Sequence, residues 1–289
     1  MIFNIKQKDK KKIYFFLSLS VFLLILNVLP IRLINEEGWS GYEKFNLDYQ
    51  SINTIEQLHK IIDDSAQVHH CKPKSLEYTE WVTEIIKQRF RHGYSHYYFN
   101  QNWVASVLGY VYWRDLSAVV EPNDLMLYPN AACSQQSIVM MEILKRQGVP
   151  FCKVGWNHHF TLCAWIEGGW RYYDPNMEPI MSIDQRKFND NFLNIEFLAS
   201  IYKDRINSNN IEYALGVPKL GRINEFPAPK ALLFHKVTKV ISITLWIFAL
   251  IPAIYFYRPI NVKTKKAGHK VFRKRPSKVQ QPTLTSAES

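Results

Sequence analysis

Two apolar segments without charged side chains, one near each end of the chain, set the strongest limit on the fold. The first covers residues 13–31 and the second covers residues 240–257, which is 19 and 18 residues respectively. About 20 helical residues, at a rise of about 1.5 Å each, cross a hydrocarbon core of about 30 Å, so both segments are long enough to span a membrane. The sequence therefore predicts two transmembrane helices with one domain, residues 33–236, between them.

The distribution of charge gives the orientation. The chain has a net charge of +11, but residues 1–12 hold five Lys against one Asp, and residues 258–289 hold nine Lys or Arg against one Glu. Because Lys and Arg beside a membrane span stay in the cytoplasm, both tails are predicted to be cytoplasmic and the domain external. The C-terminal tail lacks hydrophobic periodicity, so we expect it to be disordered and held near anionic lipid. The domain is close to neutral, which argues against a nucleic-acid partner.

Each apolar segment also has a second interpretation. The first has the basic start of a signal peptide, but residues 27–32 offer no small-x-small cleavage site. The second has the composition of a buried core helix, where Pro252 would interrupt the hydrogen bonds. Neither segment carries an ionisable residue at its centre, where transport would require one, so we interpret both as anchors.

Hydrophobic periodicity in the domain predicts an α+β fold. Helices are expected over about 53–62, 75–90, 102–111 and 133–147, with a loop over 121–131. Strands are expected over 151–156, 159–166 and 170–173. Turn residues at 157–158 and 167–168 predict two consecutive hairpins.

A possible catalytic group begins at Cys133, the predicted first residue of a helix. The free N–H groups and the partial positive charge of a helix N-terminus stabilise a thiolate and can hold an oxyanion. His159 opens the second predicted strand and Asp174 follows the third. With a turn at 167–168, Asp174 lies opposite Thr161 on the face of His159, within reach of its ring; a turn at 168–169 takes Asp174 out of reach. The three side chains match a nucleophile, a general base and an orienting carboxylate.

This order resembles the transglutaminase-like superfamily of papain-like cysteine enzymes, in its bacterial membrane-anchored form. The resemblance covers about residues 127–179: a Cys at a helix start, Gly-x-Pro at 148–150, a His opening a strand, and Gly-Trp at 169–170 before Asp-Pro at 174–175. It implies a papain-like core, a Cys133, His159 and Asp174 triad, and location in a bacterial cell or inner membrane. The implied activity is that of a peptidase, an amidase or a transglutaminase, acting on peptide or protein amides through an acyl-thioester. No cofactor and no metal are predicted.

The chain departs from the family at two places. Ala131 and Ala132 stand before Cys133, where the family usually has Gly with an acidic or amide residue. Thr161 stands two residues after His159, where an aromatic residue is frequent. Neither departure removes Cys133, His159 or Asp174. Both put in question which substrate the resemblance implies.

Other interpretations of the same residues remain open. Cys133 suits a buried apolar position, Asp174 suits a turn before Pro175, and His158 competes with His159 as the base. The side chain of the oxyanion hole is not identified among Gln101, Asn102, Trp103 and Asn130. A metal site would draw on His69, His70, Cys71, Cys152, His158, His159 and Cys163, whose spacing fits no structural zinc motif. The whole domain is also consistent with a non-catalytic binding or assembly module at the membrane surface.

The remaining cysteines give one further expectation. If residues 157–158 form a two-residue turn, Cys152 and Cys163 are direct cross-strand neighbours. Antiparallel neighbours have Cα atoms about 4.5–5.5 Å apart, a separation that a disulfide tolerates. We left open whether the two are bonded or are small buried thiols, and we expect Cys71 to be reduced.

Overall fold

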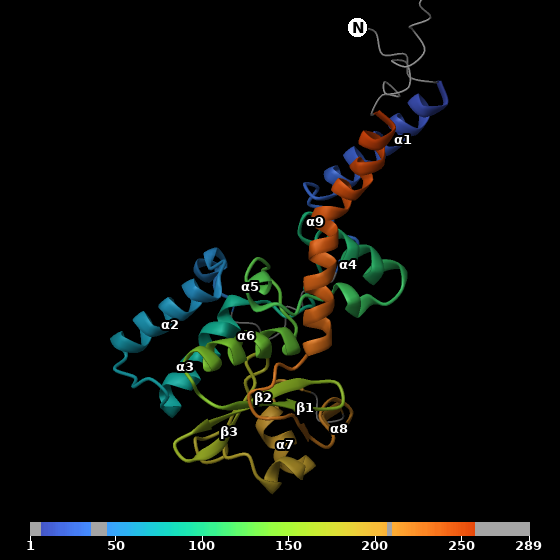
Figure 1. Cartoon of the computed structure of the whole chain (residues 1–289). Coiled ribbons are helices and arrows are strands. Elements are labelled where there is room, and N and C mark those ends of the chain that lie inside the picture. Colours follow the sequence, from blue (N-terminus) through green and yellow to red (C-terminus); the bar gives the residue numbers. More distant parts are fainter. Residues whose placement is uncertain (1–6, 36–44, 207–209, 258–289) are drawn as a thin grey trace, which may run out of the picture. The chain divides into compact units, whose positions relative to one another are not determined.

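The computed structural model describes residues 7–35, 45–206 and 210–257. The elements follow in the order α1 (Gln7–Leu26), η1 (Leu47–Ser51), α2 (Ile55–Val68), α3 (Leu76–Arg89), α4 (Phe99–Val111), η2 (Arg114–Ser117), α5 (Pro122–Leu125), α6 (Cys133–Arg146), β1 (Phe151–Gly155), β2 (Phe160–Ile166), β3 (Gly169–Tyr173), η3 (Asp190–Leu193), α7 (Ile195–Tyr202), α8 (Ile211–Ala214), β4 (Lys219–Leu220) and α9 (Pro229–Tyr257) (Figure 1). The four strands form one antiparallel sheet in the order β3-β2-β1-β4. The described part of the chain is therefore an α+β fold, as the periodicity predicts.

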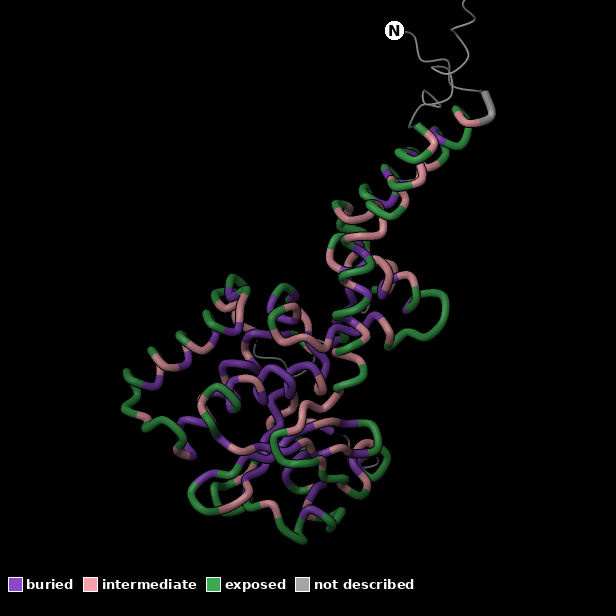
Figure 2. The backbone as a smooth tube through the Cα atoms, in the orientation of Figure 1, coloured by how far each residue is buried: buried purple, intermediate pink, exposed green. Residues whose placement is uncertain are grey.

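Helices that precede the sheet in the chain cover one of its faces, and helices that follow β3 cover the other. One face carries Leu162, Ala164 and Tyr173, which join the core formed with α2, α3 and α6. The other face carries Cys163 and Tyr172, which join a second core formed with η3, α7 and α8. The buried stretches of the tube in Figure 2 follow α6 and the central strands between these two layers. Alternation along the strands explains the division, because neighbouring side chains point to opposite faces.

The first hairpin has the predicted register, and the second has one of the two registers that the sequence leaves open. In the first, Cys152 pairs with Cys163 and Gly155 pairs with Phe160, which leaves residues 157–158 at the turn. In the second, Leu162 pairs with Tyr173 and Ile166 pairs with Gly169.

The second turn is centred on Glu167 and Gly168, whose φ angles are +49° and +76°. Two consecutive left-handed residues form the tight turn whose twist matches that of a hairpin. This choice of turn, rather than 168–169, brings Asp174 to the end of the sheet near His159.

Most helix boundaries follow from capping. The Thr54 hydroxyl accepts from Gln57 N–H at the start of α2, and the Ser75 hydroxyl accepts from Tyr78 N–H at the start of α3. Helix α6 begins at Cys133 and is followed by Gly148, whose φ of +66° suits a residue without a Cβ. Two expectations need correction. The third helix starts at Phe99 with a break at Asn102, and the expected loop 121–131 contains the short helix α5, which starts at a proline.

Helix α9 is the one described helix that is long and apolar enough to cross a membrane. The expected first span, 13–31, is helical only to Leu26, so 14 charge-free residues of it lie in α1. Pro30 disfavours the helical conformation of the residue before it, Leu29. The expectations for the C-terminal tail 258–289, and for residues 1–6 of the N-terminal tail, lie outside the described residues.

The described chain divides into two compact units. One is Phe22–Trp246, and the other combines residues 1–21 with residues 247–289, of which 7–21 and 247–257 are described. In the second unit the rings of Phe16 and Phe256 stack with their centroids 6.2 Å apart, and the Lys12 ammonium lies 4.7 Å from the Phe256 ring centre. The sheet, its covering helices and all the residues discussed below belong to Phe22–Trp246, apart from the end of α9.

Candidate active site

The start of α6 presents the Cys133 thiol at the end of the sheet. Cys133 is the first residue of the helix and is half-buried. The preceding Ala132 offers no side-chain acceptor, so no cap of that kind occupies the first-turn N–H groups. The Ser137 hydroxyl, one turn further on, donates to the carbonyl of Phe160 at 3.3 Å and ties the helix to the beginning of β2. The sulfur is thereby brought to the strand that follows His159.

Gln135 fixes the backbone around this helix start. Its side-chain oxygen accepts from Ala132 N–H at 3.1 Å and from Ser95 N–H at 2.9 Å. Its amide nitrogen donates to the carbonyls of Ser95 at 3.0 Å and Val119 at 2.8 Å. Gln135 is buried, and the four hydrogen bonds satisfy its amide completely. The turn that carries Cys133 is therefore held from two sides by segments distant in sequence.

His159 and Asp174 form a buried pair beside Cys133. The Nε2 atom of His159 lies 2.5 Å from Oδ2 of Asp174, and both side chains are almost completely buried. The backbone of His159 closes the hairpin turn, since its carbonyl accepts from Trp156 N–H at 2.9 Å. Cys133 lies close enough to the same imidazole to raise its pKa. Because Nε2 faces the carboxylate, Nδ1 is the ring nitrogen left for the sulfur.

Asp174 is held by four donors. Its Oδ1 accepts from the N–H groups of Asn176 at 3.1 Å and Met177 at 3.0 Å, and its Oδ2 accepts from His159 and from the Tyr202 hydroxyl at 2.8 Å. The Tyr202 hydroxyl also lies 2.7 Å from that of Tyr172. Both tyrosines are fully buried on the sheet face that α7 covers. The carboxylate is thus fixed in place by a hydrogen-bonded chain that begins in the second core.

These contacts shift the two pKa values in opposite directions. Burial by itself lowers the pKa of His159, but the charges of Asp174 and Cys133 and their hydrogen bonds outweigh it, so the net shift is upward. Burial raises the pKa of Asp174, but the charge of His159 and the bonds from His159, Met177 N–H and Tyr202 outweigh it and lower the pKa. The pair therefore favours an imidazolium facing a carboxylate.

The structure separates the two neighbouring histidines. His158 is exposed in the turn, and its ring stacks on Tyr213 with a centroid separation of 4.2 Å. His159 alone of the two reaches Asp174. The geometry brings Cys133, His159 and Asp174 together and leaves His158 outside the group.

Three of the four side chains considered for the oxyanion hole, those of Gln101, Asn102 and Trp103, are bonded elsewhere. Asn102 and Trp103 bind α9, and the Gln101 side-chain oxygen accepts from the Tyr128 hydroxyl and from Tyr98 N–H. Asn130 contributes its backbone, whose carbonyl accepts from the Ser95 hydroxyl at 2.6 Å. The Asn130 side chain and the backbone N–H groups of the first turn of α6 remain as candidates for holding an oxyanion.

The other three cysteines are free thiols. Cys152 and Cys163 face one another across β1 and β2, are buried and are not bonded. Burial raises the pKa of Cys163. Cys71 is half-buried and also free, and the ring of its neighbour His69 lies 4.5 Å from that of Trp81. Within the described ranges, no three His, Cys, Asp or Glu side chains are grouped to hold a metal ion.

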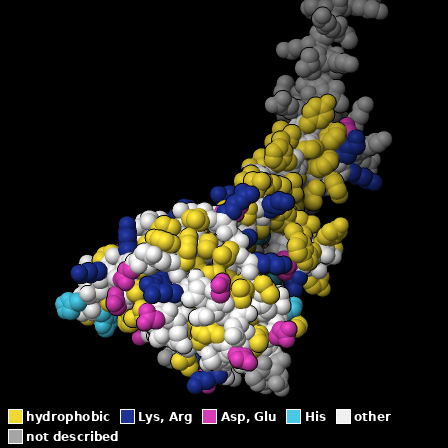
Figure 3. All heavy atoms as spheres, turned by 90° about the horizontal axis from the view of Figure 1, so that it is seen from below, with side chains coloured by type: hydrophobic (Ala, Val, Ile, Leu, Met, Phe, Trp, Pro, Cys, Tyr) yellow, Lys and Arg dark blue, Asp and Glu magenta, His cyan; other side chains and the backbone are white. Residues whose placement is uncertain are grey.

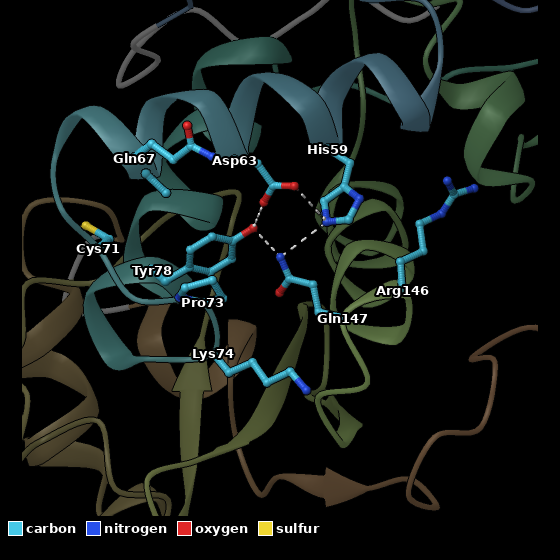
Figure 4. A pocket seen from close by; sticks show the side chains of 10 residues that line it. His59, Asp63, Gln67, Cys71, Pro73, Lys74, Tyr78, Arg146 and Gln147 are labelled. Carbon is cyan, nitrogen blue, oxygen red and sulfur yellow. Dashed lines mark hydrogen bonds and ion pairs between the residues drawn. The ribbon is translucent and has the colours of Figure 1, made fainter.

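A separate cavity of about 390 Å³ lies at the other end of α6 (Figure 4). It is lined by His59, Asp63, Ala66, Gln67, Cys71, Pro73, Lys74, Tyr78, Arg146 and Gln147. Inside it the Tyr78 hydroxyl donates to Asp63 at 2.6 Å and accepts from the Gln147 amide. The 14-residue length of α6 separates this cavity from Cys133 by about 20 Å, so it does not belong to the Cys133 group.

Comparison of the chain with models of protein families, with curated proteins and with solved structures gave no match. The argument for the site therefore rests on its geometry. Sequence reasoning missed two parts of that geometry, Gln135 and Tyr202. The Gln at the third position of α6 was a visible signal, because it is the position from which a side chain bonds back to the helix start. Tyr202 had no local signal.

Proposed function

We propose that this protein is a membrane-anchored cysteine enzyme that cleaves or transfers amide bonds through an acyl-thioester. The observation that carries the proposal is the buried pair of His159 and Asp174, 2.5 Å apart, with Cys133 as the second partner of the imidazole. A raised histidine pKa beside a half-buried thiol at a helix start suits a thiolate–imidazolium pair. A histidine with only a structural role would need the bond to Asp174 but not a thiol beside its ring.

In the first half-reaction, the Cys133 thiolate attacks the carbonyl carbon of an amide. The first-turn N–H groups of α6 stabilise the oxyanion that develops. His159 gives its proton to the departing amine nitrogen, the C–N bond breaks and the acyl group stays on the sulfur as a thioester. Asp174 holds the imidazole with Nδ1 toward the sulfur and stabilises its positive charge.

In the second half-reaction, His159 takes a proton from the acceptor, which attacks the thioester carbonyl, and Cys133 leaves as a thiolate. Water as acceptor gives a peptidase or an amidase, whereas an amine gives transglutaminase-type transfer. The substrate class is a peptide or protein amide. The chain order of a Cys at a helix start, a His before a strand and an Asp after the next strand supports a place in the transglutaminase-like superfamily, with a papain-like core.

The experiment is to trap the intermediate on the full chain in detergent or nanodiscs. We expect intact mass spectrometry, with a panel of amide substrates, to reveal an acyl adduct on the wild-type protein and none on Cys133→Ala. Iodoacetamide at neutral pH should alkylate Cys133 much faster than Cys71, which is equally half-buried, so Cys71→Ala serves as the matched control. Equal alkylation rates and no adduct with any amide would favour the non-catalytic binding module instead.

For the topology, we propose that 13–31 and 240–257 both cross the membrane, that both tails are cytoplasmic, and that 33–236 lies outside a bacterial cell or inner membrane. The apolar length of α9 and the basic residues beyond it support this arrangement. Protease added outside sealed cells should cut the domain and spare both tails. Cleavage of the C-terminal tail from outside would overturn the orientation.

A further inference from the structure

Helix α4 is joined to α9 by a row of polar contacts. The Asn102 amide nitrogen donates to the Thr238 hydroxyl at 2.9 Å, and its oxygen accepts from the Ser242 hydroxyl at 3.2 Å. The indole N–H of Trp103 donates to the carbonyl of Ser242 at 3.1 Å. Asn102 is fully buried, and its φ of −162° breaks the helix so that its side chain reaches α9. These bonds fix the start of α4 at the level of Thr238 to Ser242.

That level is where the membrane-facing part of α9 begins. Lys239 is the last charged residue before the apolar run 240–257, and it forms ion pairs with Glu121 at 2.8 Å and with Asp124. An ammonium paired to two carboxylates belongs on the water side of the boundary, and a charge-free run belongs on the lipid side. Ser242, which holds α4, already lies within the run. Helix α4 therefore starts at the boundary itself.

The composition and exposure of α4 fit that position. Residues 92–113 contain no Lys, Arg, Asp or Glu. Four consecutive large side chains are exposed at and just after the end of α4: Tyr110, Val111, Tyr112 and Trp113. Tyr112 exposes 86% and Trp113 61% of the accessible surface of the residue. Contiguous exposed aromatic residues of this kind mark a contact surface, and Tyr and Trp are enriched where lipid meets water.

The other apolar segment reaches the same helix. Phe99 N–H donates to the carbonyl of Ile31 at 2.9 Å, and Asn100 N–H donates to that of Leu29 at 3.1 Å. The chain that follows α1 thus runs along the start of α4. In Figure 3 the apolar helices carry mostly hydrophobic side chains, and hydrophobic and charged side chains are mixed over the rest of the visible face. Both predicted spans therefore meet the domain at α4.

We propose that α4 is an interfacial membrane helix, and that Tyr110, Val111, Tyr112 and Trp113 insert into the headgroup layer of the lipid. The occupant of this patch is the lipid surface because the patch lies at the end of a charge-free helix whose start is bonded to Thr238 and Ser242, where the apolar run of α9 begins. The Phe22–Trp246 unit is thereby seated on the bilayer by a third element besides the two ends of the chain. The proposal uses the membrane span of α9 and is independent of the chemistry at Cys133.

The test measures which tryptophans lie in lipid. The full chain is reconstituted in nanodiscs of phosphatidylcholine, either unmodified or brominated near the carbonyl end of the acyl chains. The fluorescence emission of Trp113 is obtained by subtracting the spectrum of Trp113→Phe from that of the wild-type protein. The substitution keeps an aromatic ring at this position. We expect brominated lipid to remove most of this difference and acrylamide in the water phase to affect it little.

Two controls set the scale. Trp165 is 44% exposed on β2, so its emission, taken from Trp165→Phe, should respond to acrylamide and not to brominated lipid. Trp246 lies in the apolar run of α9, so its emission, taken from Trp246→Phe, should respond to brominated lipid. Trp113 emission that behaves like that of Trp165 overturns the proposal. Trp113 emission that responds to neither quencher also overturns it, because a protein surface such as a second copy then covers the patch.

Discussion

Replacing Asp174 by Asn tests the electrostatic part of the site most directly. The substitution keeps one oxygen for the N–H groups of Asn176 and Met177 but turns an NH₂ group toward His159 Nε2 and the Tyr202 hydroxyl. A buried charge then loses its partner, which costs about 3–5 kcal/mol. For a domain of this size, about 2–4 °C of melting temperature corresponds to 1 kcal/mol, so we expect a drop of about 6–20 °C at mildly acidic pH.

The drop should depend on pH in a defined direction. The pKa of His159 is raised above its ordinary value of 6.5, so its contribution to folding is full below pH 6.5 and is lost as the pH rises through the raised value. In Asp174→Asn the imidazole loses the charge of Asp174, the largest contribution that raises its pKa, and keeps the burial that lowers the pKa together with the opposing effect of Cys133. The pKa of His159 therefore falls, and protonation stabilises the folded variant less than it stabilises the wild-type protein. The difference between wild type and variant should therefore be largest at about pH 5–6 and should shrink toward the cost of a neutral hydrogen bond, about 1 kcal/mol, at high pH.

The assay is thermal unfolding of the full chain in nanodiscs, followed by tryptophan fluorescence between about pH 5 and 10. This range lies above the ordinary pKa of Asp174, 3.8, so its carboxylate is charged throughout. Asp64→Asn is the matched control, because Asp64 is exposed and pairs with the exposed Lys60; we expect a change within about 0.5 kcal/mol. A loss in Asp174→Asn that is the same at every pH, or no larger than that of Asp64→Asn, would refute the reasoning.

Three other substitutions or treatments have defined outcomes. Cys133→Ala should abolish turnover and leave the melting temperature within about 1–2 °C of wild type, since a half-buried side chain at a helix start leaves little cavity; a large drop would point to a structural role. Tyr202→Phe removes one donor to the carboxylate and leaves the Tyr172 hydroxyl without that partner, so the unfolding free energy should fall by about 1–3 kcal/mol; an unchanged melting curve would contradict the network. Mild oxidation followed by non-reducing peptide mapping should join Cys152 to Cys163, which are cross-strand neighbours; a link through Cys133 would contradict the register.

The local parts of the site were predictable from the sequence. Turn residues at 157–158 predict the register of the first hairpin, and those at 167–169 leave two registers for the second. The structure has the one that brings His159 and Asp174 to the same end of the sheet. A Gly after α6 determines where the helix ends, and Cys133 marks where it begins. Such features depend on a few neighbouring residues, so a sequence pattern carries them.

The parts that depend on distant contacts were not predictable. Tyr202 reaches Asp174 from α7, and no periodicity links that helix to the hairpin. Asn102 is one of the four residues that the sequence offers as an oxyanion donor, but in the structure its amide binds α9. A buried polar side chain needs a hydrogen-bond partner. The sequence around Asn102 indicates that its amide has a hydrogen-bond partner, but it does not identify that partner.

The polar row between α4 and α9 limits how the rest of the domain can be separated from α9. Removing residues 229–257 would leave the Asn102 amide without Thr238 and Ser242 and would expose the face of α4 that α9 covers. Exchanging α9 for an unrelated apolar helix would likewise leave the buried Asn102 amide without the hydroxyls of Thr238 and Ser242, whereas the Trp103 indole donates to a backbone carbonyl that any helix in this place offers. A secreted form for biochemical work should therefore end after Ser242 rather than before Pro229, and should replace the exposed apolar residues of the retained turns with polar ones.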